Sequence, residues 1–175
     1  TTDNDAAGFT ATQSGGSTVV AETGSTDTFT VVLTAQPASD VVLSVVSGDT
    51  GEATVDKSTL TFTNGNWNSA QTVTVTGVDD DLDDGYWQLG ITLAVVDGSS
   101  ADAFDNVANQ TVGVINNDDD TAGFTIAHTS GATIVTEDAE TDTFSLVLNA
   151  QPAGNVVLSV SSSDTGEVTT GSNTV

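Results

Sequence analysis

The chain has 175 residues, of which 25 are acidic and only one, Lys57, is a lysine or arginine, so its formal net charge is -24. This charge excludes the usual modes of binding to nucleic acid or to an anionic membrane, since both need a cationic protein surface. The chain is nevertheless 37% apolar and rich in valine and threonine, a composition typical of β-sheets rather than of a disordered acidic tail. It has no cysteine, which excludes disulfides and thiolate metal sites, and no apolar run long enough to span a bilayer.

Apolar and polar residues alternate along most of the first 115 residues, a pattern that predicts half-buried antiparallel strands separated by Gly, Asp and Ser clusters. We expect strands near residues 8–13, 17–22, 26–35, 40–47, 53–62, 71–77, 86–96 and 107–115. Seven or eight strands in this length predict an all-β, immunoglobulin-like antiparallel β-sandwich. Trp87 begins the clearest alternating segment, so we expect it on the core-facing side. Trp67 falls in a loop, where we expect it to anchor one end of the sandwich.

The chain repeats itself with an offset of 115 residues. Residues 6–60 and 121–175 align without a gap, and 30 of the 55 positions are identical. A period of this length suits one self-contained domain per repeat. We therefore expect a linker from a preceding repeat at residues 1–5, a complete sandwich at 6–120, and the N-terminal half of a second repeat at 121–175.

Two dense acidic clusters lie at residues 79–85 and 116–120, the second at the junction between the two copies. Calcium suits such groups, because it takes six to eight oxygen ligands in an irregular geometry. Zinc would need histidine or cysteine, and the chain has one histidine. The alternative is that the acids are solvated turn residues. Because the helix-flanked calcium loop pattern is absent, a calcium site would have to be assembled from several interstrand loops.

Several of these segments together resemble Calx-β-type domains, in particular the tandem copies of large bacterial surface and secreted adhesin-like proteins. The matching segments are residues 20–22, 49–52, 73–80 and 114–120, in the order and at the spacing found in that family. The resemblance implies a Calx-β-like sandwich with calcium bound at one tip. It also implies a ligand set, which in this sequence consists of Glu22, Asp49, Asp79, Asp80, Asp84, Asp118, Asp119 and Asp120.

No arrangement of residues in the sequence favours catalysis. The only histidine, His128, corresponds to Gln13 in the first copy, and a catalytic base should not be confined to one of two copies. The chain also has no Gly-x-Ser-x-Gly motif. We therefore expect that the protein is not an enzyme.

The sequence favours a structural function: a calcium-stabilised extender repeat of a secreted or cell-surface adhesin-like protein, in which calcium at the junctions stiffens the array. Binding of a carbohydrate or a host surface is the first alternative, and calcium sensing is the second. The expected partners are calcium and neighbouring copies of the repeat. Because half a sandwich exposes apolar faces and strand edges, we also expect another chain to complete residues 121–175, by strand addition or domain swapping.

Overall fold

The computed structural model describes residues 5–171 and 174–175, which fall into two compact units. The first unit contains the residues up to Asp80 together with Asp84–Asp119. The second contains Asp81–Asp83 and Asp120–Val175. Of the linker expected at residues 1–5, all but Asp5 lies outside the described residues. Among the residues that are described, no helix is long and apolar enough to cross a membrane.

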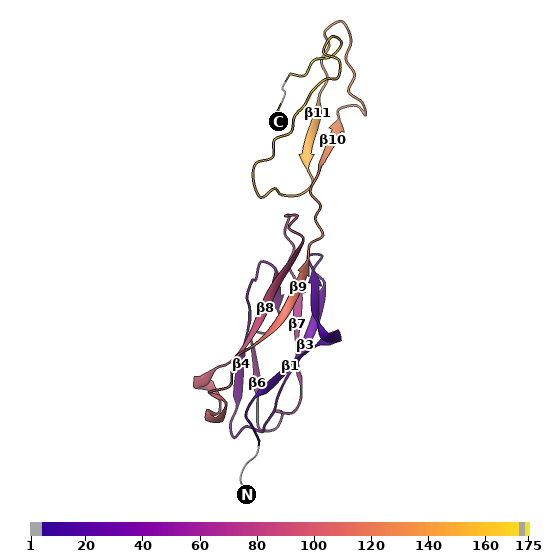
Figure 1. Ribbon diagram of the computed structural model, residues 1–175. Helices are drawn as coiled ribbons and strands as arrows, with labels where there is room; N and C mark the ends of the chain where they lie inside the picture. Colours follow the sequence, from indigo (N-terminus) through magenta and orange to yellow (C-terminus); the bar gives the residue numbers. More distant parts are fainter. Residues whose placement is uncertain (1–4, 172–173) are drawn as a thin grey trace. The chain divides into compact units, whose positions relative to one another are not determined.

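The first unit is a sandwich of two sheets (Figure 1). One sheet has the order β1-β3-β7-β5, and the other has the order β2-β9-β8-β4-β6. The strands are β1 (Phe9–Gln13), β2 (Thr18–Ala21), β3 (Thr26–Leu33), β4 (Val41–Ser47), β5 (Ala53–Val55), β6 (Thr59–Phe62), β7 (Gln71–Gly77), β8 (Tyr86–Val95) and β9 (Gln110–Asn117). Short 3-10 helices follow β1 at Ser14–Gly16 and precede β9 at Asp97–Ser99 and Asp102–Phe104. The predicted all-β immunoglobulin-like sandwich is therefore confirmed.

The core of this unit consists of alternate residues from both sheets, because successive side chains of a strand point to opposite faces. Phe29 and Val31 of β3 are completely buried, as are Val73 and Val75 of β7 in the same sheet. The facing sheet contributes completely buried residues at the same spacing, among them Val41, Leu43, Ile91 and Leu93. The alternation in the sequence thus predicts correctly which side of each of these strands faces the core.

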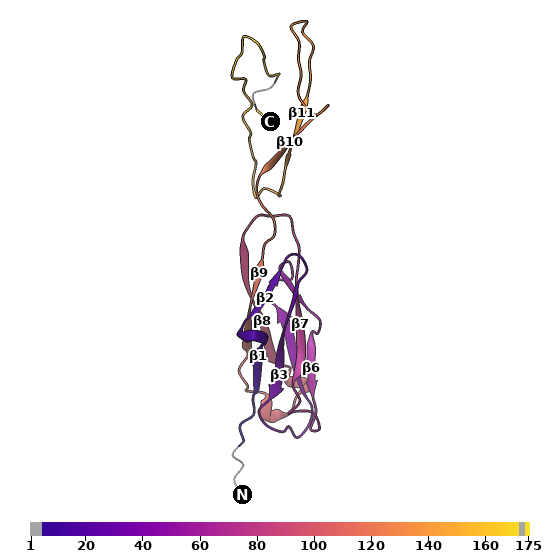
Figure 2. The ribbon, with the colours of Figure 1, turned by 90° about the vertical axis from the view of Figure 1, so that its right-hand side faces the viewer.

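Two features depart from the predicted antiparallel sandwich. β2 pairs with β9 in parallel. The chain leaves the first sheet after β1 and enters the second sheet at β2 (Figure 2). Gly15 and Gly16 in the connecting 3-10 helix have positive φ angles of 60° and 87°, which glycine adopts without steric cost. The single strand expected at residues 53–62 is also two strands, since β5 and β6 belong to different sheets.

The two tryptophans occupy different environments. Trp67 is partly buried and packs against the core, as predicted for an anchor. Trp87 is 44% exposed, so its predicted place in the core is wrong. It does share a face with Leu89 and Ile91, but the first residues of β8 are exposed and burial becomes complete only at Ile91.

The second unit reproduces the pairing of the first unit with the offset of 115 residues. Its strands β10 (Phe124–His128) and β11 (Phe144–Leu148) pair antiparallel, with Phe124 opposite Leu148, as Phe9 lies opposite Leu33 in β1 and β3. Leu158 and Val175 exchange two backbone hydrogen bonds of 3.1 Å, and the equivalent residues Leu43 and Leu60 pair in β4 and β6. The equivalent apolar residues differ in burial, however.

The first prediction compares two equivalent phenylalanines. Phe9 is 4% exposed and Phe124 is 50% exposed. Phe9→Ala should therefore lower the free energy of unfolding of the first unit by about 3–5 kcal/mol, the usual cost of removing a buried phenylalanine side chain. Phe124→Ala should leave that transition unchanged within about 0.5 kcal/mol. Chemical denaturation monitored at the first unit measures both values, and equal effects would contradict the assigned difference in packing.

Candidate metal centre

One end of the first unit gathers acidic side chains from segments that are distant in the sequence. It is the end at which β9 leaves the sandwich (Figure 1). The residue after β2 and the last residue of β9 are joined there by a 3.0 Å hydrogen bond from the backbone N–H of Glu22 to the carbonyl of Asn117. The residues around β5 and β7 are joined in the same way, by a 2.9 Å bond from Val78 N–H to the carbonyl of Glu52. The sheet pairing therefore fixes where the acidic residues meet, and we call this end the acidic tip.

Glu22 is the most deeply buried acid of the tip, with 2% of its surface exposed. One of its carboxylate oxygens lies within 4.8 Å of an oxygen of Asp118. Burial, followed by the charges of Asp118, Asp80 and Glu52, raises the pKa of Glu22 to about 7, although the N–H of Asp119 donates to its carboxyl group.

Glu52 is the second buried acid of the tip, at 8% exposed. Asn116, which is 1% exposed, donates hydrogen bonds from Nδ2 to Glu52 Oε2 at 3.2 Å and to the carbonyl of Val78 at 3.3 Å. Burial raises the pKa of Glu52, and the charges of Asp84, Asp80 and Asp49 raise it further, while the bond from Asn116 opposes the shift. Because Asp80 acts on both buried glutamates, the two belong to one electrostatic cluster.

Two buried oxygens of the tip lack hydrogen-bond donors. Glu22 Oε2 and Asn116 Oδ1 are inaccessible to solvent and accept no hydrogen bond within the structure. Buried polar atoms are nearly always satisfied, because an unsatisfied one costs about 1–3 kcal/mol. Two orphaned acceptors beside several carboxylates are the arrangement that a cation would satisfy.

Gly77 allows the segments of the tip to approach one another closely. A Cβ atom at this position would lie 2.2 Å from the carbonyl oxygen of Ala21 and 2.8 Å from Asn116 Oδ1. Any other residue would therefore have to displace the backbone that leads to Glu22. Gly77 keeps the orphaned Asn116 oxygen and the residue before Glu22 next to each other.

Asp118 organises the acidic loop that precedes β8. Its Oδ2 accepts hydrogen bonds from the backbone N–H groups of Asp84 at 2.8 Å and Gly85 at 2.7 Å, and its own N–H donates to the carbonyl of Gly85 at 2.9 Å. These bonds fix one end of the loop to the end of β9. Asp118 is therefore both a member of the carboxylate cluster and a support for the loop that carries Asp84.

The predicted ligands occupy different positions around the tip. The charges of Asp80 and Asp118 act on Glu22. The charges of Asp84 and Asp49 act on Glu52. Asp49 is exposed, and its Oδ1 accepts a 2.9 Å hydrogen bond from Gly51 N–H, which closes its own turn. Three further predicted residues lie on the adjoining segments: Asp79 and Asp119 are exposed, and Asp120 is half-buried.

Sequence reasoning missed Glu52 and Asn116. Two signals could have identified them. Glu52 directly precedes the buried β5 and recurs as Glu167 in the second copy. Asn116 continues the two-residue spacing of Val112 and Val114, so it had to be a polar residue on the core-facing side of β9.

The donor set suits a hard cation that binds oxygen. It combines carboxylates with an amide oxygen, as calcium sites do, and irregular loops can satisfy the flexible coordination of calcium. Zinc would favour histidine or cysteine; the only histidine, His128, belongs to the second unit. When bound, a divalent cation would be held by Glu22, Glu52, Asn116, Asp80 and Asp118, and it would neutralise carboxylates that otherwise repel one another.

No family model matches this chain, and no curated protein matches it. Among solved structures, it is similar to the apo form of the Calx CBD1 domain, at 18% identity and a TM-score of 0.45 over 64% of this chain and 98% of that one. It is also similar to the calcium binding domain CBD12 of CALX1.1, at 19% identity and a TM-score of 0.45 over 69% of this chain and 48% of that one. The E. coli chaperone DraB matches at 8% identity and a TM-score of 0.45 over 86% of this chain and 90% of that one.

The second prediction concerns the pH dependence of stability without divalent cations. The pKa of Glu22 is about 7 in the folded chain, whereas the ordinary pKa of a glutamate is 4.5, so between these values the folded state binds more protons than the unfolded state. The contribution of Glu22 to the stability of the first unit is therefore fully present below pH 4.5 and is lost as the pH rises through 7. Thermal melting in chelator from pH 5 to 8 measures the slope.

Two variants separate Glu22 from the other acids. Glu22→Gln should flatten the slope in chelator and raise the melting temperature at pH 8, because it removes a buried charge. Its repeat equivalent, Glu137, is exposed, so Glu137→Gln should leave the slope of the first unit unchanged. If both variants gave the same profile as the parent chain, Glu22 would not be the group that couples stability to pH.

Proposed function

We propose that this chain is a calcium-stabilised structural repeat, an extender segment of a secreted or cell-surface adhesin-like protein, and that it is not an enzyme. The observation that carries the proposal is the pair of buried, unsatisfied oxygens, Glu22 Oε2 and Asn116 Oδ1, within a cluster of carboxylates. A divalent cation supplies the positive charge that the protein itself lacks at this end. The repetition of the sandwich unit supports a role in reach, because a spacer gains length from each copy without needing a recognition site in any of them.

The position of the acids in the chain suggests how calcium would act in an array. Asp118 and Asp119 end the first unit, and Asp120 begins the main segment of the second. Three consecutive carboxylates repel one another, and a bound cation would reduce that repulsion. Calcium at such a junction would therefore stiffen the array. Extracellular calcium is abundant, which suits a weak structural site with a dissociation constant of about 10⁻⁴ M or weaker; a calcium sensor would bind at micromolar concentrations.

Ligand binding remains a second candidate function because of two exposed aromatic side chains. Tyr86 is 64% exposed and Trp87 is 44% exposed, at adjacent positions of β8. Because adjacent residues of a strand point to opposite faces, each side chain presents a separate ring, and an exposed aromatic ring can stack against a sugar or bind another surface. A glycan array probed with the parent chain and with Trp87→Ala tests this candidate. Hits that disappear in Trp87→Ala would favour it over a purely structural role.

The third prediction concerns removal of the metal. Calcium at about one hundred times its dissociation constant should stabilise the folded state by roughly 2.7 kcal/mol per site. A chelator should therefore lower the melting temperature of the first unit by several degrees, and added calcium should restore it. Magnesium at the same concentration serves as the control and should have a smaller effect, because it retains its water ligands more strongly. Identical melting curves with and without chelator would refute the calcium proposal.

The fourth prediction distinguishes ligands from solvated acids. Asp80→Asn and Glu52→Gln should each weaken calcium binding tenfold or more, equivalent to about 1.4 kcal/mol, because each removes a charge from the cluster. Asp40→Asn is the matched control: Asp40 is exposed, and the second copy has Asn155 at the equivalent position. Isothermal titration calorimetry measures the affinities. An equal loss in all three variants would indicate diffuse electrostatic attraction instead of a defined site.

A further inference from the structure

The outer face of the five-stranded sheet in the first unit contains a stretch of backbone without side chains. Gly113 of β9 lies opposite Gly90 of β8. The N–H of Gly48, the residue after β4, donates a 2.9 Å hydrogen bond to the carbonyl of Gly90. Val112 and Val114 are buried, so Gly113 between them is on the solvent-facing side of β9. Three glycines in three adjacent segments thus form a shallow trough across the sheet.

The packing of the sheet explains two of these glycines but not Gly113. A Cβ atom at Gly48 would lie 2.9 Å from the carbonyl oxygen of Gly90, and one at Gly90 would lie 2.6 Å from Cγ2 of Thr111. A Cβ atom at Gly113 would meet no other part of the chain within 4 Å, and the register of β8 and β9 continues through this position without a bulge. A glycine inside a strand weakens it, and one without a bulge or close packing marks a place where a ligand approaches the backbone.

Gly113 lies in the lining of a hollow with a volume of about 260 Å³. Gln13 and Ser17 line it from the connection between β1 and β2, and Gln88 and Ile115 line it from β8 and β9, where they lie opposite each other. The volume is below the range of pockets for drug-sized molecules, so it suits a single ring. None of the lining residues is charged, although the chain has 25 acidic residues.

The polar groups of the hollow match the hydroxyl groups of a sugar. Gln13 donates from Nε2 to Thr18 Oγ1 at 3.0 Å and to the carbonyl of Gly113 at 2.8 Å, which fixes its side chain and leaves Oε1 as an acceptor. Gln88 and Ser17 are exposed, and their side chains both donate and accept hydrogen bonds. A net charge of -24 repels an anionic ligand, and the lining has no carboxylate to attract a cationic one. A neutral ligand with several hydroxyl groups fits these conditions.

Tyr86 extends the same face towards the start of β8. It lies two residues before Gln88, so both side chains project from the same side of the strand. Its ring is exposed, and an aromatic ring can stack against the apolar face of a sugar. Trp87 projects from the opposite side. Tyr86 is therefore placed to contact a second ring beside the one in the hollow.

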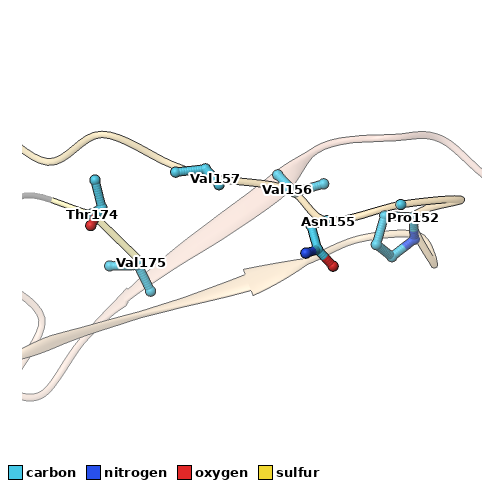
Figure 3. Close-up of a pocket in the computed structure, with 7 residues that line it drawn as sticks. Pro152, Asn155, Val156, Val157, Thr174 and Val175 are labelled. Carbon is cyan, nitrogen blue, oxygen red and sulfur yellow. The ribbon is translucent and has the colours of Figure 1, made fainter.

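The hollow of the second unit in Figure 3 has a different character. It lies between residues 156–157 and 174–175. In the first unit the equivalents of residues 156–157 are Val41 and Val42, and these pair with β6. That hollow therefore has the position of a strand of the sandwich and is not a ligand site.

We infer that the hollow beside Gly113 binds one ring of a neutral saccharide. The ring lies over the backbone of Gly113, its hydroxyl groups bond to Gln13, Ser17 and Gln88, and Tyr86 stacks against the next ring of the same glycan. This inference rests on the second candidate function, ligand binding, and assigns its site and the class of its ligand. It does not depend on the cation.

The test begins with an array of neutral, sialylated and sulfated glycans, probed with the labelled 175-residue chain at a constant calcium concentration. The chain should bind neutral glycans. Binding only to the sialylated or sulfated glycans would overturn the inference but would leave ligand binding as a function. No binding at all would overturn both, and it would leave the calcium-stabilised role, which the chelator experiment tests separately.

Gly113→Val should fill the hollow and preserve the fold. Valine favours strands and a Cβ atom has room at this position, so the melting temperature should be unchanged or higher. The affinity for the neutral glycans that bind the parent chain should fall about tenfold or more, because the valine side chain occupies the place of the ring. Thr61→Val is the matched control, since it places a valine on the exposed side of β6 in the same sheet, and it should retain the affinity. A lower melting temperature with unchanged affinity would give Gly113 a purely structural role and overturn the inference.

Two exposed side chains test the site without a change near the backbone of Gly113. Tyr86→Ala and Gln88→Ala should each weaken glycan binding about fivefold or more. Trp87→Ala should weaken it less than Tyr86→Ala does, because Trp87 projects from the other side of β8. The opposite order would place the ligand on that other side and overturn the assigned site, whereas ligand binding itself would stand.

Discussion

The structure of the first unit depends on how it holds two buried glutamates among other carboxylates. Glu22 and Glu52 are both more than nine-tenths buried, and the charge of Asp80 acts on each. The only lysine or arginine cannot compensate them, because the ammonium of Lys57 lies 2.6 Å from Asp56 and also donates to the carbonyl of Thr72. Burial favours the neutral form of a carboxyl group unless an opposite charge is present. At neutral pH the carboxyl groups of the tip must therefore retain protons, repel one another or bind a cation, and a cation would supply the positive charge that the orphaned oxygens lack.

The sandwich topology creates this situation from ordinary strand pairing. The crossing of the chain from β1 to β2 places Glu22 beside the end of β9, since β2 runs parallel to β9. The pairing of β5 with β7 places Glu52 on the other sheet, next to Val78. Gly77 then allows the two sheet ends to approach, so that Asn116 can reach Glu52. No local motif is needed, which explains why the acids of the tip come from four separate stretches of sequence.

Two-residue periodicity was sufficient to predict most of the strands and most of the core, because burial in a sheet alternates from one residue to the next; it did not reveal that residues 53–62 form two strands in different sheets. It was insufficient at the strand ends. Trp87 lies on the predicted face but near the exposed start of β8, and periodicity does not reveal where the opposing layer stops. The high density of acidic residues at 79–85 and 116–120 predicted a metal site formed by these segments. It could not reveal Glu52, an isolated acid beside a short strand, and it did not single out Asn116, the uncharged first residue of the second cluster; their importance comes from a contact over 64 positions of sequence.

The repeat separates what the chain builds locally from what needs the whole sandwich. Asp142 accepts hydrogen bonds from Ile134 and Thr143, as Asp27 does from Val19 and Thr28, and Asp164 closes the same turn as Asp49. These acids accept the same hydrogen bonds in both units, so their structural role does not require a complete core. Glu137, the equivalent of Glu22, is exposed, because the neighbours of Glu22 come from the opposite half of the repeat. Glu22 and Glu52 precede residue 61, whereas Asp80, Asn116 and Asp118 follow it. A cation site with this composition can form only when both halves of a repeat are joined, so cation binding and completion of the sandwich must stabilise each other.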